Sequence, residues 1–185
     1  MINSLQLKQA ARLIRAGGII AYPTEAVYGL GCDPLNPQAV RRLLAIKGRA
    51  VEKGVILVAA DFDQLRPFVG ELDSERMVEV LASWPGPVTW LLPVAPQVPD
   101  WLTGGRDTLA VRVTAHRQTA ALCRAAGMPL VSTSANQSGR PAARSALQVR
   151  LHCPGADLIL PGATDKRARP SEIRDARSGK LLRAG

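Results

Sequence analysis

The amino-acid sequence predicts an α/β fold, in which helices cover a single sheet. Segments whose apolar residues recur at helical spacing alternate along the chain with short apolar runs, and this alternation is typical of the α/β class. The length of 185 residues indicates one domain with an extensive core. Hydrophobic residues make up 46% of the chain and charged residues 21%, which excludes a disordered protein.

Helical spacing of apolar residues predicts five helical segments. The first covers residues 4–16, with Ser4 as its N-cap and the glycine pair at 17–18 as its end. The second covers residues 37–47 and begins with a proline, which the first turn of a helix accepts because the N–H there has no partner. Two short helical stretches, 61–68 and 74–84, and a helix over 117–126 complete the set.

Short apolar runs predict the strands of the sheet. Residues 54–60 form an unbroken apolar run, as expected for a strand that is buried on both faces. Further strands are expected at residues 18–22, 88–94, 108–114, 129–132 and 157–160, and a hairpin at 171–177 and 180–183. Because ligands of open α/β sheets bind at strand ends, we expect the chemistry in the polar loops that join these segments.

The composition excludes several classes of protein. The apolar runs are too short to cross a bilayer, and the N-terminus lacks the basic and apolar regions of a secretory signal, so we expect a cytoplasmic protein without a membrane partner. The three cysteines, Cys32, Cys123 and Cys153, show no Cys-x-x-Cys spacing, which excludes a disulfide framework and a zinc ribbon. Two histidines are too few for a His-rich metal site.

The net charge of +9 is distributed unevenly along the chain. Residues 1–92 hold ten basic and nine acidic side chains, whereas residues 93–185 hold fourteen and six. The basic half favours a polyanionic partner, either a nucleic acid or a nucleotide, and a GC-rich genome that favours Arg codons is the alternative explanation. We expect part of this charge to form an RNA-facing surface, separate from the nucleotide site, that draws on Arg140, Arg144, Arg150, Lys166, Arg167, Arg169, Arg174, Arg177, Lys180 and Arg183.

Four polar segments are candidates for a functional site. Residues 22–31 place hydroxyl groups beside glycines where a strand ends, and residues 131–139 place hydroxyl and amide side chains directly after another strand, which suits phosphate or ribose oxygens. Lys47 and Arg49, separated by one glycine, are suited to clamp an anion. Arg112 lies in an apolar strand and therefore requires a carboxylate or an anionic ligand. The structural alternatives are a turn, cations that end a helix, and an ion pair in the core.

The sequence shows no catalytic nucleophile. Ser134 has no histidine that spacing can place beside it, and the Gly-x-Ser-x-Gly, His-Glu-x-x-His and Walker A patterns are absent. No pair of catalytic carboxylates stands out. A site of cations, hydroxyls and amides suits positioning and charge stabilisation at phosphates, which favours phosphoryl or nucleotidyl transfer over acid–base hydrolysis.

Taken together, these motifs resemble those of the YrdC-like family. The resemblance rests on six segments in the family's order: Tyr22-Pro-Thr-Glu-Ala-Val-Tyr-Gly-Leu-Gly, Lys47-Gly-Arg, Trp84-Pro-Gly-Pro-Val-Thr, Ala110-Val-Arg-Val-Thr, Ser132-Thr-Ser-Ala-Asn-Gln-Ser-Gly and Pro170-Ser-Glu-Ile-Arg-Asp. It extends over residues 5–185 and implies a single domain with an open, twisted, mixed sheet covered by helices. Two departures are Ala50, where the family commonly has proline, and an unusually basic stretch at 162–170.

The resemblance also implies a reaction. Short bacterial members of the family make threonylcarbamoyl-AMP and pyrophosphate from L-threonine, bicarbonate and ATP, for the N6-threonylcarbamoyladenosine modification of tRNA position 37. ATP is therefore implied as a substrate, with Mg²⁺ carried by ATP rather than by a metal site of the protein. Implied partners are tRNA and the downstream threonylcarbamoyl-transferase proteins. The attacking group is the carboxylate of N-carboxy-threonine, so cations must screen it from the phosphates.

Residue by residue, the resemblance implies a site with two halves. Lys47 and Arg49 are implied as the catalytic cations. The ATP site is implied to comprise Lys47, Arg49, Thr108, Ser134, Asn136 and Arg183. The threonine site is implied to comprise Thr24, Arg112, Ser132 and Ser171, with Arg112 on the threonine carboxylate.

Two other functions stay open at this point. The first is a basic module that holds double-stranded RNA or tRNA without chemistry. The second is a carbamoyl-adenylate domain like that of hydrogenase maturation proteins, which would use carbamoyl phosphate in place of threonine. That domain occurs in long chains with zinc-finger and acylphosphatase parts, and no such parts are visible in this sequence. Release of pyrophosphate from ATP, with and without L-threonine and bicarbonate, distinguishes the three functions.

Overall fold

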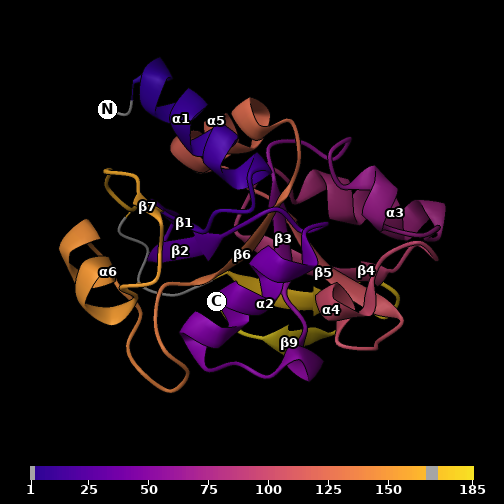
Figure 1. Cartoon of the computed structure of the whole chain (residues 1–185). Helices are drawn as coiled ribbons and strands as arrows, with labels where there is room; N and C mark the ends of the chain where they lie inside the picture. Colours follow the sequence, from indigo (N-terminus) through magenta and orange to yellow (C-terminus); the bar gives the residue numbers. More distant parts are fainter. Residues whose placement is uncertain (1–2, 166–170) are drawn as a thin grey trace.

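The computed structural model describes residues 3–165 and 171–185. Within them lies one nine-stranded sheet with the strand order β7-β1-β2-β6-β3-β5-β4-β8-β9 (Figure 1). The pairs β1–β7, β3–β5 and β4–β8 are parallel and the others antiparallel, which confirms the predicted open mixed sheet. The strands are β1 (Ile20–Pro23), β2 (Tyr28–Gly31), β3 (Ile56–Ala59), β4 (Val88–Pro93), β5 (Thr108–Val113), β6 (Leu130–Ser134), β7 (Leu158–Ile159), β8 (Glu172–Asp175) and β9 (Leu181–Arg183).

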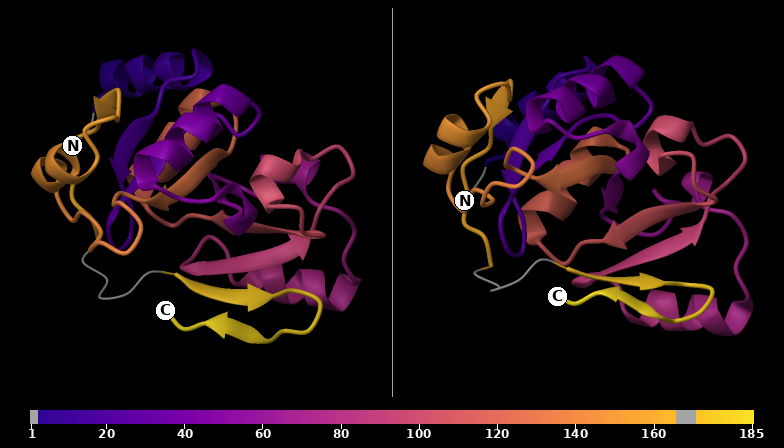
Figure 2. Two further views of the ribbon diagram at one scale, coloured as in Figure 1. Left: turned by 60° about the horizontal axis from the view of Figure 1, so that its bottom comes forward. Right: turned by 90° about the horizontal axis from the view of Figure 1, so that it is seen from below.

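The helices lie over the sheet and at one of its edges. The described residues form α1 (Ser4–Arg15), α2 (Pro37–Lys47), α3 (Ser74–Ala82), α4 (Asp100–Thr103), α5 (Arg117–Ala126) and α6 (Ala146–His152), with short 3₁₀ turns η1 (Val51–Lys53) and η2 (Arg66–Phe68). Figure 2 shows the yellow β8–β9 hairpin below β4, and β9 forms the edge of the sheet opposite β7. The predicted C-terminal hairpin is therefore confirmed, and it extends the sheet beyond β4.

Strand side chains alternate between two separate cores, as the period of two requires. Ile20 and Val58 pack with the apolar faces of α1 and α5 on one side of the sheet. Leu30 and Leu57 pack with α2 on the other side. Figure 1 shows α1 and α5 lying together above β1 and β3. Neither α1 nor α5 packs against β4 or β5, and this leaves room for a cavity on the same face of the sheet.

Two predicted details of the helices are wrong. The N-cap of α1 is Asn3 rather than Ser4, because the Asn3 side chain accepts from the backbone N–H of Gln6 at 2.8 Å and the Gln6 side chain accepts from that of Asn3 at 3.1 Å. The helical stretch predicted over 61–68 is reduced to η2, since the proline at 67 has no N–H to donate to an earlier carbonyl oxygen and an α-helix cannot run through it.

The sequence did not predict β2, α4 or α6. β2 reads Tyr-Gly-Leu-Gly, and two glycines in four residues lower the strand propensity. The glycine at 31 is required by packing, because a Cβ there would lie 2.6 Å from the carbonyl oxygen of Val131 on the neighbouring chain segment and 2.8 Å from the Tyr22 ring. A tertiary contact therefore requires the glycine that lowers the local strand propensity.

Within the described residues, no helix is both long and apolar enough to cross a membrane.

Candidate functional site

A cavity of about 560 Å³ lies against the sheet on the same side as α1 and α5. On β5 the alternate residues Thr108, Ala110 and Arg112 face it, whereas Leu109 and Val111 point into the opposite core. On β4, Thr89 and Leu91 face it in the same way. The cavity thus lies along a strand face as well as beside the loops in which most of the chemistry was expected.

Nine of the ten predicted site residues line this cavity. They are Thr24, Arg49, Thr108, Arg112, Ser132, Ser134, Asn136, Ser171 and Arg183. The cavity wall combines the β1–β2 turn, the segment after α2, the five strands β2 to β6, α4 and the β8–β9 hairpin. Folding therefore brings together segments that are far apart in the sequence, as the motifs indicated. Lys47 does not belong to this wall.

Lys47 instead lies behind the wall, where it holds a turn of the chain. Its side chain is buried, and its Nζ donates to the carbonyl oxygens of Ser134 at 2.5 Å and Asn136 at 2.8 Å and to Oδ1 of Asn136 at 3.2 Å. These three acceptors match the three donors of an ammonium group. Burial, assisted by the charge of Arg49 and opposed by Cys153, lowers the pKa of Lys47 to about 8.

Arg49 faces the cavity and does not converge with Lys47. Gly48 ends α2 in the left-handed conformation at φ 55°. The side chain of Arg49, the next residue, contacts the end of η1. Its Nη2 donates to the carbonyl oxygens of Gly54 at 2.9 Å and Lys53 at 3.3 Å. Burial first, and then the charge of Arg106, lowers the pKa of Arg49. In this structure the two cations do not converge, because Arg49 faces the cavity and Lys47 bonds to the turn behind the wall, so the two-cation clamp stays a prediction.

Ser134 and Asn136 form a preorganised polar turn on the wall. The Ser134 hydroxyl donates to Oδ1 of Asn136 at 2.6 Å, and Nδ2 of Asn136 donates to the carbonyl oxygens of Gln137 at 2.9 Å and Arg140 at 2.6 Å. Together with Lys47, these contacts fix both residues before any ligand binds. Fixed hydroxyls, amides and N–H groups suit the binding of phosphate oxygens.

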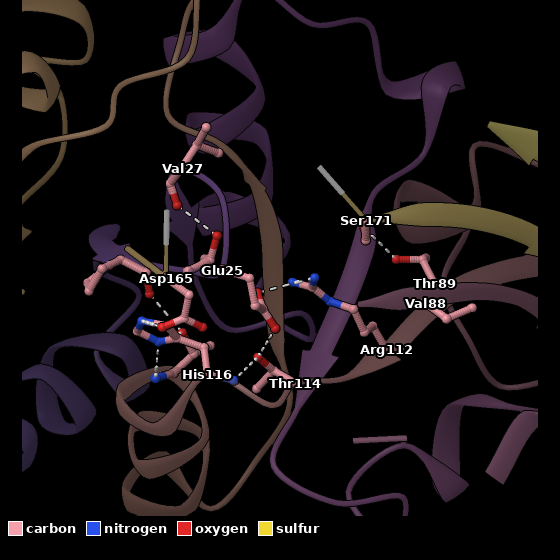
Figure 3. A network of polar contacts seen from close by, with 12 residues as sticks. Glu25, Val27, Val88, Thr89, Arg112, Thr114, His116, Asp165 and Ser171 are labelled. Atoms are coloured by element: carbon pink, nitrogen blue, oxygen red, sulfur yellow. Dashed lines mark hydrogen bonds and ion pairs between the residues drawn. The ribbon is translucent and has the colours of Figure 1, made fainter. Parts of the chain in front are cut away.

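Hydroxyls and arginines line the opposite part of the wall. Thr24 donates to the carbonyl oxygen of Val27 at 2.7 Å within the β1–β2 turn. Ser171 and Thr89 share a hydrogen bond of 2.9 Å, and Figure 3 shows this pair on the other side of Arg112 from Glu25. Arg183 donates from Nη2 to the carbonyl oxygen of Ser171 at 2.7 Å, and burial, followed by the charge of Arg112, lowers the pKa of Arg183.

The cavity is strongly cationic. Its described lining includes Arg49, Lys53, Arg106, Arg112, Arg140 and Arg183, whereas Glu25 is the sole acidic side chain among those lining residues. Such a concentration of one sign attracts anionic ligands such as nucleotides and carboxylates. Glu25, which pairs with Arg112, was not among the predicted site residues. The signal available in the sequence was that an arginine in an apolar strand needs a carboxylate, but not which carboxylate would supply it.

Comparisons with known proteins agree on one family. A family model described as "Telomere recombination", named after Sua5, YciO and YrdC, matches residues 12–185. A protein of Nitrosococcus oceani, named threonylcarbamoyl-AMP synthase, is 56% identical over 179 residues, which are 96% of this chain and 97% of that protein. The crystal structure of P. abyssi Sua5 complexed with L-threonine superposes with a TM-score of 0.89 at 36% identity, over 95% of this chain and 52% of that one. The crystal structure of E. coli YciO superposes with a TM-score of 0.88 at 25% identity, over 100% of this chain and 91% of that one.

Proposed function

The chain belongs to the Sua5/YciO/YrdC family, and on this premise we propose that it is a threonylcarbamoyl-AMP synthase that acts as a nucleotidyltransferase. Its substrates are L-threonine, bicarbonate and ATP. One observation carries the proposal: a single cavity of about 560 Å³ gathers a fixed hydroxyl–amide turn and six cationic side chains around one ligand space. ATP, N-carboxy-threonine and the transition state between them all carry negative charge, which this wall is built to bind.

The proposed chemistry needs no nucleophile from the protein. A carboxylate oxygen of N-carboxy-threonine forms a bond to the α-phosphorus of ATP, and the bond from that phosphorus to the bridging oxygen breaks. Pyrophosphate leaves with the bonding electron pair, and threonylcarbamoyl-AMP remains. Two anions must meet in line, so positioning and screening supply the catalysis.

The site residues are proposed to divide between the two substrates. Arg49, Thr108, Ser134, Asn136 and Arg183 bind ATP, with Lys47 supporting the turn behind them. Thr24, Arg112, Ser132 and Ser171 bind threonine, whose carboxylate is met by Arg112. Because Glu25, the sole acid of the described lining, already pairs with Arg112, we propose that Mg²⁺ arrives on the phosphates of ATP and supplies charge neutralisation there.

The proposal is tested by direct detection of the product. Purified protein is expected to form threonylcarbamoyl-AMP, identified by mass spectrometry, and to release pyrophosphate in equal amount. Both products should disappear when L-threonine or bicarbonate is omitted, or when carbamoyl phosphate replaces threonine. A protein that binds RNA but releases no threonine-dependent pyrophosphate would be the basic RNA module instead.

A tRNA partner is proposed on the basis of the charge, with a correction to the expected surface. Arg140 and Arg183 line the cavity rather than a separate surface. Lys166, Arg167 and Arg169 lie outside the described residues. The exposed Arg144 and Arg150, beside and within α6, keep the proposal of an RNA-facing surface apart from the cavity.

The R144Q/R150Q variant is therefore expected to bind tRNA less tightly at low salt. The slope of log affinity against log salt should flatten by about two, because two phosphate contacts no longer release counterions. Synthesis of threonylcarbamoyl-AMP without tRNA should stay within about twofold of wild type, whereas R140Q should impair it. Wild-type binding that does not change with salt would contradict an RNA-facing surface. We also propose that the protein acts in the cytoplasm and passes threonylcarbamoyl-AMP to downstream threonylcarbamoyl-transferase proteins.

A further inference from the structure

We propose that Glu25 is a positioning residue that fixes the guanidinium of Arg112 for the carboxylate of the amino-acid substrate, an inference that rests on the proposed function. The pair joins the β1–β2 turn to β5 across the cavity wall. Glu25 Oε2 lies 3.3 Å from Arg112 Nη1, and the side chains are 5% and 10% exposed. The geometry is shown in Figure 3.

Glu25 is itself held in place from β5. The hydroxyl of Thr114 donates to Glu25 Oε1 at 2.7 Å, and the backbone N–H of His116 donates to the Thr114 oxygen at 3.1 Å. The backbone N–H of Thr114 is bound to the carbonyl oxygen of Ala59 on β3. The carboxylate is thus anchored to the sheet by a hydrogen bond and an ion pair, and it transmits that rigidity to Arg112.

Arg112 keeps donors for a second carboxylate. A guanidinium carries five N–H donors in a fixed plane, and Glu25 contacts one of its nitrogens. Arg112 Nε is buried and has no hydrogen-bond partner among the described residues. A buried donor of a charged group without an acceptor is costly, and a ligand carboxylate in the adjoining cavity would supply one. An arginine held by one carboxylate is therefore presented to another.

The pair is better explained by function than by stability. Replacing a buried ion pair with apolar residues of similar volume is often neutral or stabilising, so stability alone gives little reason to keep one here. Without Glu25, the buried positive charge of Arg112 would have no paired carboxylate, in a wall that also holds the positive charge of Arg183. The fixed negative charge lets several cations share the cavity without repelling one another out of position.

Glu25 acts as a fixed charge and not as a proton acceptor. Burial alone would raise the pKa of Glu25, but the charge of Arg112, the Thr114 hydroxyl, its own backbone N–H and His116 together lower it. The carboxylate therefore stays ionised near neutral pH, where it is a weak base towards the ammonium group of an amino acid. Its role is that of a fixed negative charge that orients Arg112 and offsets the neighbouring cations.

The test compares threonine and ATP kinetics in the full-length protein. E25Q is expected to raise the KM for L-threonine on the order of 10- to 100-fold, because the buried ion-pair partner that orients Arg112 is lost. The KM for ATP should stay within about threefold of wild type, and E25D, which keeps the charge, should recover part of the threonine affinity. Thr114→Val, which removes the hydroxyl but leaves both charges, should raise the threonine KM less than E25Q does and serves as the second variant should E25Q unfold.

A double-mutant cycle decides whether Glu25 acts through Arg112. In an R112K background, where the planar guanidinium and its paired N–H donors are already lost, adding E25Q should change the threonine KM by less than about threefold. An unchanged threonine KM in E25Q, or equal losses for threonine and ATP, would overturn the inference; if E25Q does not fold, an unchanged threonine KM in Thr114→Val would do so. If the wild-type protein forms no threonylcarbamoyl-AMP, the proposed function fails instead, so the two failures are distinguishable.

Discussion

Replacing Lys47 by alanine is expected to lower kcat by roughly 30- to 1000-fold, which corresponds to about 2–4 kcal/mol of lost transition-state stabilisation. The ammonium is the common donor to three oxygens of the Ser134–Asn136 turn. Its removal takes one donor from each of these acceptors and loosens the hydroxyl and the amide that we propose bind the phosphates. The KM for threonine should change much less, because the residues proposed to bind L-threonine make no hydrogen bond to Lys47.

Steady-state kinetics of Lys47→Ala and of the matched control Lys53→Ala check this expectation. Lys53 lines the cavity but is exposed, and its loss should cost less than tenfold in kcat. An unchanged kcat in Lys47→Ala would contradict the supporting role. A similar loss in both variants would show that cationic charge alone, and not the held turn, matters for catalysis.

The activity should also fall as the pH rises through about 8, because burial lowers the pKa of Lys47 to about 8 and the neutral amine loses a donor to the turn. Stability should respond with the opposite sign. A lysine whose pKa is lowered by folding binds fewer protons in the folded than in the unfolded state, so its unfavourable contribution is present below about pH 8 and is relieved as the pH rises further. This decrease in activity above about pH 8 should be absent in Lys47→Ala.

Gly104→Ala is expected to destabilise the protein by about 2–5 kcal/mol, whereas Gly105→Ala should cost about 1–2 kcal/mol. Both glycines have positive φ, 68° and 78°, so an alanine is strained at either position. At position 104, however, a Cβ would lie 2.4 Å from the carbonyl oxygen of Glu52 and 2.9 Å from the backbone nitrogen of Gly54, whereas at 105 no atom lies within 4 Å. The difference between the two variants isolates the backbone clash.

Urea unfolding of the two variants measures that difference, and kinetics test its consequence for the site. Gly54 lines the cavity, and its carbonyl oxygen accepts from Arg49. Displacement of Glu52–Gly54 should therefore lower activity in Gly104→Ala and leave Gly105→Ala near wild type. Equal losses of stability in both variants would mean that this contact relaxes at little cost.

Local sequence patterns determined most of the secondary structure. α2 illustrates why: a proline at its start, apolar residues on one face and a glycine after its end all act within the helix itself. β5 is similar, because alternation along the strand separates Leu109 and Val111, which face a core, from Thr108 and Arg112, which face the cavity. β2 was missed because one of its glycines, Gly31, is required by a close approach of Val131 that no local pattern contains.

The sequence by itself also predicted which residues lie together: nine of the ten predicted site residues line one cavity, because the motifs that carry them resemble those of a known family. Only the tertiary structure decided how these residues are arranged. It places Lys47 behind the wall and pairs Arg112 with Glu25, a residue that the sequence offered no means to choose. The physical reason is that burial, charge pairing and close backbone contacts arise between segments far apart in the chain, whereas helical and strand patterns arise within each segment.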